Sequence, residues 1–245
     1  MRLDQRLVAL GLAASRAEAA RLVADGAVRV DGQPARKPAQ AVPEHAALTV
    51  ERAGPAWVGR GALKLVHALD SFGLIPAGTA LDLGASTGGF TEVLLARGAA
   101  RVIALDVGHG QLHPRLAADP RVRAVEGMNA RAIPEGFLPA LDWITADLSF
   151  IALRKALPRA LEAARPGARL VVLVKPQFEL GPEVVGKGGI VRDPAAHAAA
   201  CRAVAEWLAE AGWTVTHETE SPVTGGDGNR EFLLSALRDP AADAT

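Results

Sequence analysis

Apolar residues recur at helical spacing in two short stretches near the start of the chain. The first stripe consists of Leu3, Leu7 and Leu10. Gly11 ends this stretch, and Ser15 then stands three positions before Glu18, the spacing of a capping box in which each side chain bonds the other's backbone N–H. The second stripe consists of Ala19, Leu22 and Val23. Because Gly26 follows at a position where helices often end, the pattern predicts two consecutive short helices.

A strand-like pattern takes over after the second helix. Residues 28–30 alternate apolar and basic side chains, and the dipeptide Asp31-Gly32 that follows is typical of a tight turn. Residues 48–50 supply the return strand. We therefore expect a small α-α-β-turn-β module over residues 1–54.

Beyond residue 60, short apolar runs alternate with alanine-rich helical stretches. The runs are TALDL, RVIALD, RVRAVE, LDWITAD, RLVVLVKP, WTVTHE and EFLLSAL. Strands that alternate with helices are typical of a βαβ sheet, so residues 60–245 are expected to form a larger α/β domain with a Rossmann-like sheet. Between the two domains, residues 55–59 combine Pro55 and Gly59 with the isolated Trp57, a composition that suits a linker.

Charge is balanced over the chain as a whole but not at its start. The 245 residues include 27 Lys and Arg and 27 Asp and Glu, so the formal net charge is zero and the whole chain has no polyanion-binding signature. Residues 1–40 hold seven basic and four acidic side chains, 7 − 4 = +3. This local excess favours a nucleic-acid surface, with ordinary solvated charge on small helices as the alternative.

Cysteine usage and hydropathy bear on the compartment. Cys201 is the single cysteine, so neither an intrachain disulfide nor a multi-cysteine metal site can form, and a reducing compartment is expected. Charges interrupt the N-terminus, and nowhere do about 18 apolar residues run together, as a membrane helix requires. We expect a soluble, cytoplasmic, monomeric protein that binds neither membrane nor metal.

A glycine-rich loop joins a buried strand to a helix in ALDLGASTGGFTEVLLARG. Asp106 ends the next strand 22 positions after Gly84 (106 − 84), close to the spacing at which a carboxylate accepts hydrogen bonds from ribose hydroxyls. The loop lacks the glycine pattern of dinucleotide enzymes and the lysine of phosphate loops, so S-adenosylmethionine (SAM), which carries no phosphate, fits better than NAD or ATP. A turn of purely structural use is the alternative. The predicted cofactor residues are Asp82, Gly84, Ser86, Thr87, Gly88, Gly89, Phe90, Asp106, Val107, Met128, Asn129 and Asp147.

These motifs resemble two known families. Residues 2–32 are similar to the small RNA-binding module shared by a small-subunit ribosomal protein, many pseudouridine synthases and tyrosyl-tRNA synthetases. Nearly the whole chain, that module included, resembles SAM-dependent ribose 2′-O-methyltransferases of the FtsJ type and, within them, the TlyA group often called haemolysin A. The matching motifs are WVGRGALKL, LDLGASTGGFT, ADLSFI, LVKPQFE, VGKGGIVRDP and GNREFLL. The resemblance implies ribosomal RNA as the substrate and a cytidine ribose of the large subunit as the target.

The same resemblance implies a Lys-Asp-Lys-Glu tetrad. Its members are Lys64, Asp147, Lys175 and Glu231. Asp147 and Lys175 end two strands at their carboxyl ends, where open α/β sheets bind ligands. A ribose hydroxyl must be oriented and must lose its proton as the methyl group transfers, and a lysine can take that proton only if burial and a neighbouring ammonium lower its pKa. Lys175 is therefore the candidate base or hydroxyl-orienting group, and the other three support it.

Two regions supply the predicted RNA contacts. These contacts are Arg2, Arg16, Arg21, Arg29, Lys187 and Arg192. The first four belong to the N-terminal module, where guanidinium groups suit the phosphates of A-form RNA. The last two lie in residues 176–193, a Gly/Pro-rich stretch expected to be a structureless substrate-side lid with hinges at Gly188 and Gly189. Gly59 and Pro182 depart from the family's usual serine and basic residue, which affects the expected linker and lid but not the tetrad.

Three other functions compete with this interpretation. A pore-forming haemolysin would need a membrane-insertable segment, for which the sequence offers no candidate. A ribosome-assembly factor could keep the fold without turnover, although the intact tetrad positions argue against it. A methyltransferase acting on bases would use an Asn-Pro-Pro-Tyr-type loop or a nucleophilic cysteine, but the chain has no tyrosine and Cys201 lies in an alanine-rich helical stretch.

Overall fold

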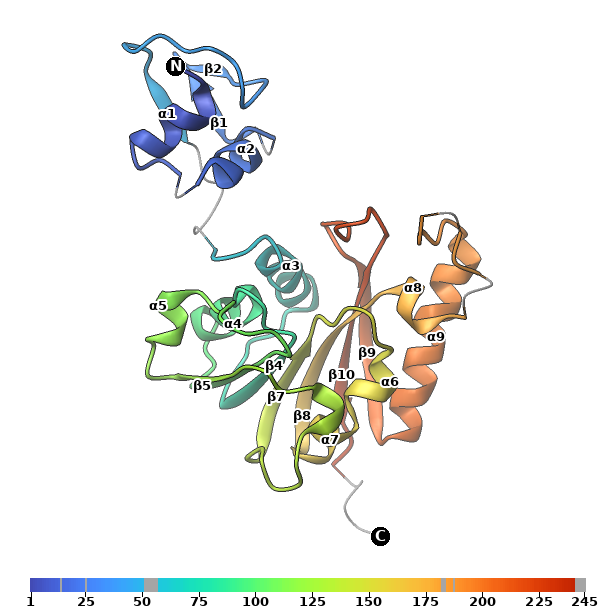
Figure 1. Ribbon diagram of the computed structural model, residues 1–245. Helices are drawn as coiled ribbons and strands as arrows, with labels where there is room; N and C mark the ends of the chain where they lie inside the picture. Colours follow the sequence, from blue (N-terminus) through green and yellow to red (C-terminus); the bar gives the residue numbers. More distant parts are fainter. Residues whose placement is uncertain (14, 25, 51–56, 182–183, 187, 241–245) are drawn as a thin grey trace. The chain divides into compact units, whose positions relative to one another are not determined.

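The computed structural model describes all residues except 14, 25, 51–56, 182–183, 187 and 241–245 (Figure 1). The chain divides into two compact units, Met1–Ala56 and Trp57–Thr245. Each unit is described by itself. Within the described residues, no helix is both long and apolar enough to cross a membrane.

The N-terminal unit packs two helices on a small antiparallel sheet. Its elements are α1 (Leu3–Ala9), α2 (Arg16–Ala24), β1 (Val28–Val30), β2 (Gln33–Pro34) and β3 (Leu48–Val50). The Oγ of Ser15 accepts a hydrogen bond from the backbone N–H of Glu18 at 3.1 Å, which confirms that half of the predicted capping box. Leu3 and Leu7 are buried in the core, but Leu10 is 54% exposed because α1 ends before it, so its place on the apolar stripe was wrong.

The sheet of this unit has the order β2-β1-β3. Asp31 and Gly32 both have positive φ, 49° and 78°, as the predicted tight turn requires. The strand returning directly from that turn is β2, which sequence analysis missed because two residues, one of them a proline, carry no alternating pattern. The predicted strand at 48–50 is present as β3, paired with the other edge of β1.

The described part of the second unit forms a seven-stranded sheet of order β6-β5-β4-β7-β8-β10-β9. The strands are β4 (Thr79–Leu83), β5 (Arg101–Leu105), β6 (Val122–Val125), β7 (Leu141–Ala146), β8 (Ala164–Val174), β9 (Trp213–Glu220) and β10 (Phe232–Arg238). All seven predicted runs are strands, and the Rossmann-like α/β fold is confirmed. One feature was not predicted: β10 enters antiparallel between β8 and β9. Its first residue, Phe232, therefore pairs with Val174, the last residue of β8.

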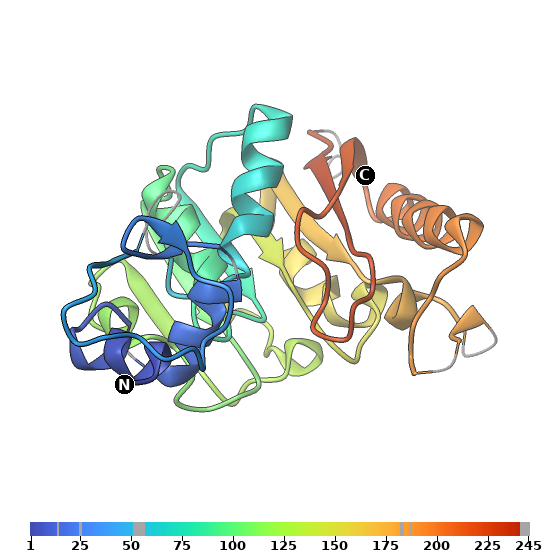
Figure 2. The ribbon, with the colours of Figure 1, turned by 90° about the horizontal axis from the view of Figure 1, so that it is seen from above.

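Helices cover both faces of this sheet (Figures 1 and 2). They are α3 (Ala62–Phe72), α4 (Gly89–Ala96), α5 (Pro114–Ala117), η1 (Ala130–Ala132), α6 (Leu153–Ala156), α7 (Pro158–Glu162), α8 (Pro176–Glu179) and α9 (Pro194–Glu210). Along β4, Ala80 packs in a cluster with α3 and α4, whereas Leu81 packs in a second cluster with α6, α7 and α9. Because neighbouring strand residues point to opposite faces, this apolar strand is buried on both sides.

Candidate active site

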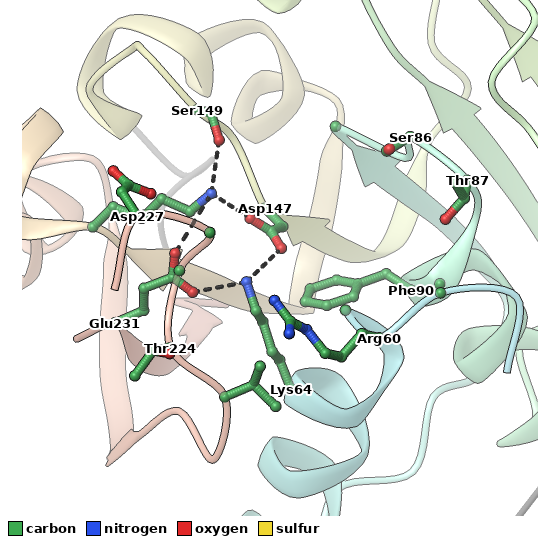
Figure 3. Close-up of a pocket in the computed structure, with 18 of the residues that line it drawn as sticks. Arg60, Lys64, Ser86, Thr87, Phe90, Asp147, Ser149, Thr224, Asp227 and Glu231 are labelled. Carbon is green, nitrogen blue, oxygen red and sulfur yellow. Dashed lines mark hydrogen bonds and ion pairs between the residues drawn. The ribbon is translucent and has the colours of Figure 1, made fainter. Parts of the chain in front are cut away.

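Four charged side chains meet at the carboxyl ends of the central strands (Figure 3). Lys64 lies in the first turn of α3, Asp147 follows β7, and Lys175 follows β8. Glu231 directly precedes β10, and the antiparallel pairing of β10 with β8 brings it beside Lys175. The structure thus brings together all four residues of the predicted tetrad.

Within this cluster, cations and anions alternate. Lys64 Nζ lies 3.2 Å from Asp147 Oδ2 and 2.7 Å from Glu231 Oε2. Lys175 Nζ lies 2.6 Å from Asp147 Oδ1 and 3.9 Å from Glu231 Oε1. Each carboxylate therefore faces both ammonium groups, and the four formal charges cancel. We name these four residues the tetrad cluster.

The tetrad cluster is nearly enclosed by protein. The side chains of Lys64, Lys175 and Glu231 are 10%, 8% and 3% exposed, and that of Asp147 is 19% exposed. Buried charges are tolerated when paired and hydrogen-bonded, so the alternation is what permits this burial. Lys175 Nζ also donates to Ser149 Oγ at 2.9 Å. Sequence analysis missed Ser149, although its place two residues after Asp147 in the ADLSF motif was a usable signal.

A cavity of about 450 Å³ opens onto the tetrad cluster. It is lined by all four cluster residues together with Arg60, Thr87 and Phe90 from the α3 and α4 side and Thr224 and Asp227 from the loop before β10 (Figure 3). Arg60 lies one turn before Lys64, and sequence analysis did not select it. We name this space the catalytic cavity.

A second cavity, of about 540 Å³, lies at the ends of β4, β5 and β7. It is lined by Gly84, Ser86, Asp106, Val107, Met128, Asn129 and Asp147, all among the predicted cofactor residues. The Asp106 carboxylate accepts hydrogen bonds from the backbone N–H groups of Ser86 at 2.8 Å and Gly108 at 2.7 Å, which fix its position. Asp147 lines both cavities, so the two spaces meet at the tetrad cluster.

Two predicted cofactor residues, Asp82 and Gly88, line neither cavity, and their contact with a cofactor stays a prediction. Asp82 is fully buried, accepts hydrogen bonds from Thr91 Oγ1 at 2.7 Å and Thr145 Oγ1 at 3.1 Å, and its burial raises its pKa to about 6. Thr87, Gly89 and Phe90 line the catalytic cavity rather than the second one.

The loop glycines are required by the protein's own packing. A Cβ at Gly84 would lie 2.4 Å from the carbonyl oxygen of Asp147, and a Cβ at Gly88 would lie 2.3 Å from Leu116 Cδ1. At Gly89 the conflict would be with the backbone of Ala62 in α3, at 2.9 Å. These contacts require glycine at each of the three positions, and the close approach of a ligand stays a prediction.

The arginines predicted to bind RNA differ in their surroundings. Arg2 and Arg16 both form ion pairs with Asp4, at 3.0 Å and 3.1 Å, and Asp4 is only 4% exposed. Their own side chains remain 47% and 58% exposed. Arg21 on α2 is exposed, and Arg29 on β1 is partly buried.

The predicted lid is more ordered than expected. It begins with the short helix α8, and Asn229, which is 1% exposed, accepts from the Val191 N–H at 3.0 Å and donates to the Gly189 carbonyl at 2.9 Å. The residues around Val191 are therefore tied to the loop that carries Glu231. Arg192 is exposed, whereas Lys187 and Pro182 lie outside the described residues.

Comparison with known proteins agrees with this geometry. A family model described as FtsJ-like methyltransferase matches residues 57–238, and a model described as S4 domain matches residues 1–48. The chain belongs to the FtsJ-like methyltransferase family. This methyltransferase is 52% identical over 239 residues to the 16S/23S rRNA (cytidine-2'-O)-methyltransferase TlyA of Mycobacterium tuberculosis, covering 95% of the chain and 88% of that relative.

Two further proteins extend the comparison. The 23S rRNA (cytidine-2'-O)-methyltransferase TlyA of Campylobacter jejuni is 32% identical, over 75% of the chain and 72% of its own length. A solved structure from Streptococcus thermophilus, named as a hemolysin candidate, superimposes with a TM-score of 0.75 at 38% identity and covers 98% of the chain and 88% of its own. The likeness to the Streptococcus thermophilus structure spans both units of the chain.

Proposed function

We propose that this chain is a SAM-dependent enzyme that methylates the ribose 2′-hydroxyl of a cytidine in large-subunit ribosomal RNA. The observation that carries the proposal is the tetrad cluster, a buried and charge-balanced set of two lysines and two carboxylates where two cavities meet. Both TlyA relatives are named for cytidine 2′-O-methylation, and both names include 23S rRNA.

The second cavity fits SAM better than a phosphate-bearing cofactor. Its acidic side chain Asp106 is held by two backbone N–H groups and can accept from ribose hydroxyls, while Val107 and Met128 offer apolar contact to a base. Gly84, Ser86 and Asp147 line both this cavity and the catalytic cavity, which supports placing the reactive end of the cofactor near the cluster. When bound, SAM supplies an electrophilic methyl group.

The chain's own residues orient and deprotonate the nucleophile. Lys175 Nζ is held by Asp147 at 2.6 Å and Ser149 at 2.9 Å, so its position in the catalytic cavity is fixed before RNA arrives. Its amine is placed to orient the 2′-hydroxyl and to accept the proton that leaves as the methyl group transfers. Lys64 bridges Asp147 and Glu231 and balances one of their two negative charges, and the proton taken up by Lys175 balances the other.

The N-terminal unit would hold the RNA. The exposed guanidinium groups of Arg2, Arg16 and Arg21, with Arg29, suit phosphate oxygens, and the S4 domain match covers all four. Arg192 and Lys187 are assigned to RNA contact on the side of the methyltransferase unit. This division gives four of the six proposed RNA contacts to the N-terminal unit and the chemistry to the methyltransferase unit.

The proposal is tested by incubating the full chain with radiolabelled SAM and separated ribosomal RNAs or subunits, followed by alkaline hydrolysis. Ribose methylation blocks cleavage at the modified nucleotide, so label should appear in an alkali-resistant dinucleotide from the large-subunit RNA that contains cytidine. Label in a free base, in small-subunit RNA alone, or in no RNA would contradict the proposal.

Calorimetry tests the cofactor assignment separately. Asp106→Ala should weaken SAM binding about 10- to 100-fold, the loss expected when hydrogen bonds to a charged acceptor disappear. Asp119→Ala removes a carboxylate that lines neither cavity and should leave the affinity unchanged. Equal affinities in the two variants would refute the role of Asp106.

A further inference from the structure

A third cavity, of about 390 Å³, lies beside the catalytic cavity. It is formed by the segments that follow β7 and β8, with Arg131 contributing from η1. Phe150, Gln177 and Phe178 line both this space and the catalytic cavity, so the two share a wall. We name it the flank cavity. Arg131 and Phe150 also line the second cavity, but the proposed reaction assigns no role to any of these four side chains.

The charges around the two spaces differ. The catalytic cavity is lined by three cationic and three acidic side chains, 3 − 3 = 0, whereas the flank cavity is lined by Arg131, Arg154 and Lys155 against Glu179, 3 − 1 = +2. Arg131 and Lys155 are exposed, and no ion pair of either is found among the described residues. Free cations beside a neutral reaction site favour an anionic ligand, such as a phosphate, next to the reacting group.

An aromatic surface separates the two cavities. Phe150 is 90% exposed and has a φ of 64°, a left-handed conformation that bulky residues rarely adopt. Its ring contacts that of Phe178, with centroids 5.2 Å apart and planes inclined by 49°. Holding a large apolar ring in water is unfavourable, and strained backbone of this kind concentrates at functional sites. Aromatic faces bordered by cations are how proteins bind unpaired nucleotides.

The amide of Gln177 adds a polar group at the same boundary. Its Oε1 is buried and has no hydrogen-bond partner among the described residues. Buried polar atoms nearly always have a hydrogen-bond partner. We therefore expect this oxygen to gain a partner from a bound ligand or through a small rotation of the amide. A nucleotide base offers both donors and acceptors to such an amide.

We propose that the flank cavity binds the nucleotide next to the methylated one in the same RNA strand. Arg131 and Lys155 contact its phosphate, and its base lies against the Phe150–Phe178 surface. The inference rests on the proposed RNA methylation and deepens it, because it adds a second nucleotide site that orients the strand across the catalytic cavity. An acidic peptide segment would satisfy the cations but not the aromatic surface, and membrane lipid would need a wider apolar face.

The test compares three single variants of the full chain in steady-state methylation of the RNA. Lys155→Ala and Phe178→Leu should each raise KM for RNA about tenfold, the loss that one phosphate contact or one stacked base represents. Lys155 lines only the flank cavity, so Lys155→Ala should leave kcat and SAM affinity unchanged. Lys155→Ala should also reduce the salt dependence of RNA binding by about one unit of slope. Arg101→Ala is the matched control. Arg101 is the first residue of β5, at the amino ends of the parallel strands, whereas the flank cavity lies beyond their carboxyl ends, so this variant should change neither KM nor the salt slope.

The outcomes separate this inference from the proposed function. Unchanged KM in both cavity variants, or the same change in Arg101→Ala, would show that the flank cavity does not bind a nucleotide. Should Phe178→Leu fold poorly, Phe150→Leu replaces it, since Phe150 is exposed and its removal leaves the core intact. Phe150 also lines the second cavity, so SAM affinity is measured for this variant as well. If the wild-type chain methylates no RNA, the proposed function fails. Binding of a fluorescent single-stranded oligoribonucleotide to the same variants then tests nucleotide binding in the flank cavity by itself. Equal affinities overturn the proposed nucleotide site, and weaker binding in the cavity variants alone supports it.

Discussion

Each unit of the molecule contains a nearly buried carboxylate paired with two cations, but the exposure of those cations differs between the units. In the N-terminal unit, Asp4 pairs with Arg2 and Arg16, whose side chains are 47% and 58% exposed. In the methyltransferase unit, Asp147 pairs with Lys64 and Lys175, whose side chains are 10% and 8% exposed. In one case the cations point into water, and in the other the protein encloses them.

The difference lies in the second carboxylate. Glu231 balances the tetrad cluster, so both lysines can be enclosed and fixed, and they are suited to act on one small group at close range. Asp4 leaves its two arginines with an excess of positive charge at the surface. Guanidinium groups held in this way keep donors free for phosphate while losing little conformational freedom on binding.

The largest effect is expected for Lys175→Ala, which removes one of the two enclosed cations of the tetrad cluster. The methylation rate should fall about 10² to 10⁴-fold, the contribution of a positioned base, while SAM and RNA affinities stay unchanged. Lys175→Arg should be nearly as inactive because a guanidinium stays protonated. Single-turnover methyl transfer and calorimetry measure the two quantities. A near-normal rate in Lys175→Ala would remove the proposed base.

The role of Glu231 as the balancing charge can be measured as stability. Glu231→Gln leaves two ammonium groups facing one carboxylate and should lower the free energy of unfolding by about 3 kcal/mol, the order seen when one partner of a buried ion pair is removed. Lys64→Gln/Glu231→Gln restores neutrality and should be more stable than the sum of the single changes predicts. Urea unfolding provides the values. Strict additivity would show that the two groups are not coupled.

The Asp4 cluster should respond to acid. The hydrogen bonds from Arg2 above all, and then those from Arg16, hold the pKa of Asp4 well below its usual range against the opposing effect of burial. A lowered pKa in the folded state stabilises the unit above the unfolded value of about 3.9, and this contribution is lost as the pH falls below it. Urea unfolding followed by NMR signals of residues 1–48 should show the loss, and Asp4→Asn should abolish it.

The smallest expected effect concerns individual arginines of the N-terminal unit. Arg21→Ala should reduce the slope of log affinity for RNA against log salt by about 0.7 to 0.9, the value for one phosphate contact. Arg16→Ala should do the same and also weaken the Asp4 cluster, so only Arg16→Ala should change the unfolding of the unit. Identical salt slopes in wild type and both variants would show that this surface does not contact RNA.

Much of this protein was predictable because its determinants are local. The seven strand runs, the glycine loop between β4 and α4 and the Ser15 half of the capping box depend on residues a few positions apart, and each appears in the structure as expected. The four tetrad residues could also be selected from the sequence, because each lies in a motif at the end of a predicted helix or strand. They are Lys64, Asp147, Lys175 and Glu231. Those positions alone could not establish that four separate segments converge.

Tertiary structure decided which charges meet and which residues face a cavity. Lys64 and Glu231 are 167 positions apart (231 − 64), and they lie 2.7 Å from one another only because β10 is inserted antiparallel beside β8. Asp82 has the right spacing for the cofactor loop, yet its side chain points into the core toward Thr91 and Thr145. The flank cavity combines segments from after β6, β7 and β8. Local periodicity specifies elements, whereas strand order and the direction of each side chain depend on long-range packing, which no window of sequence contains.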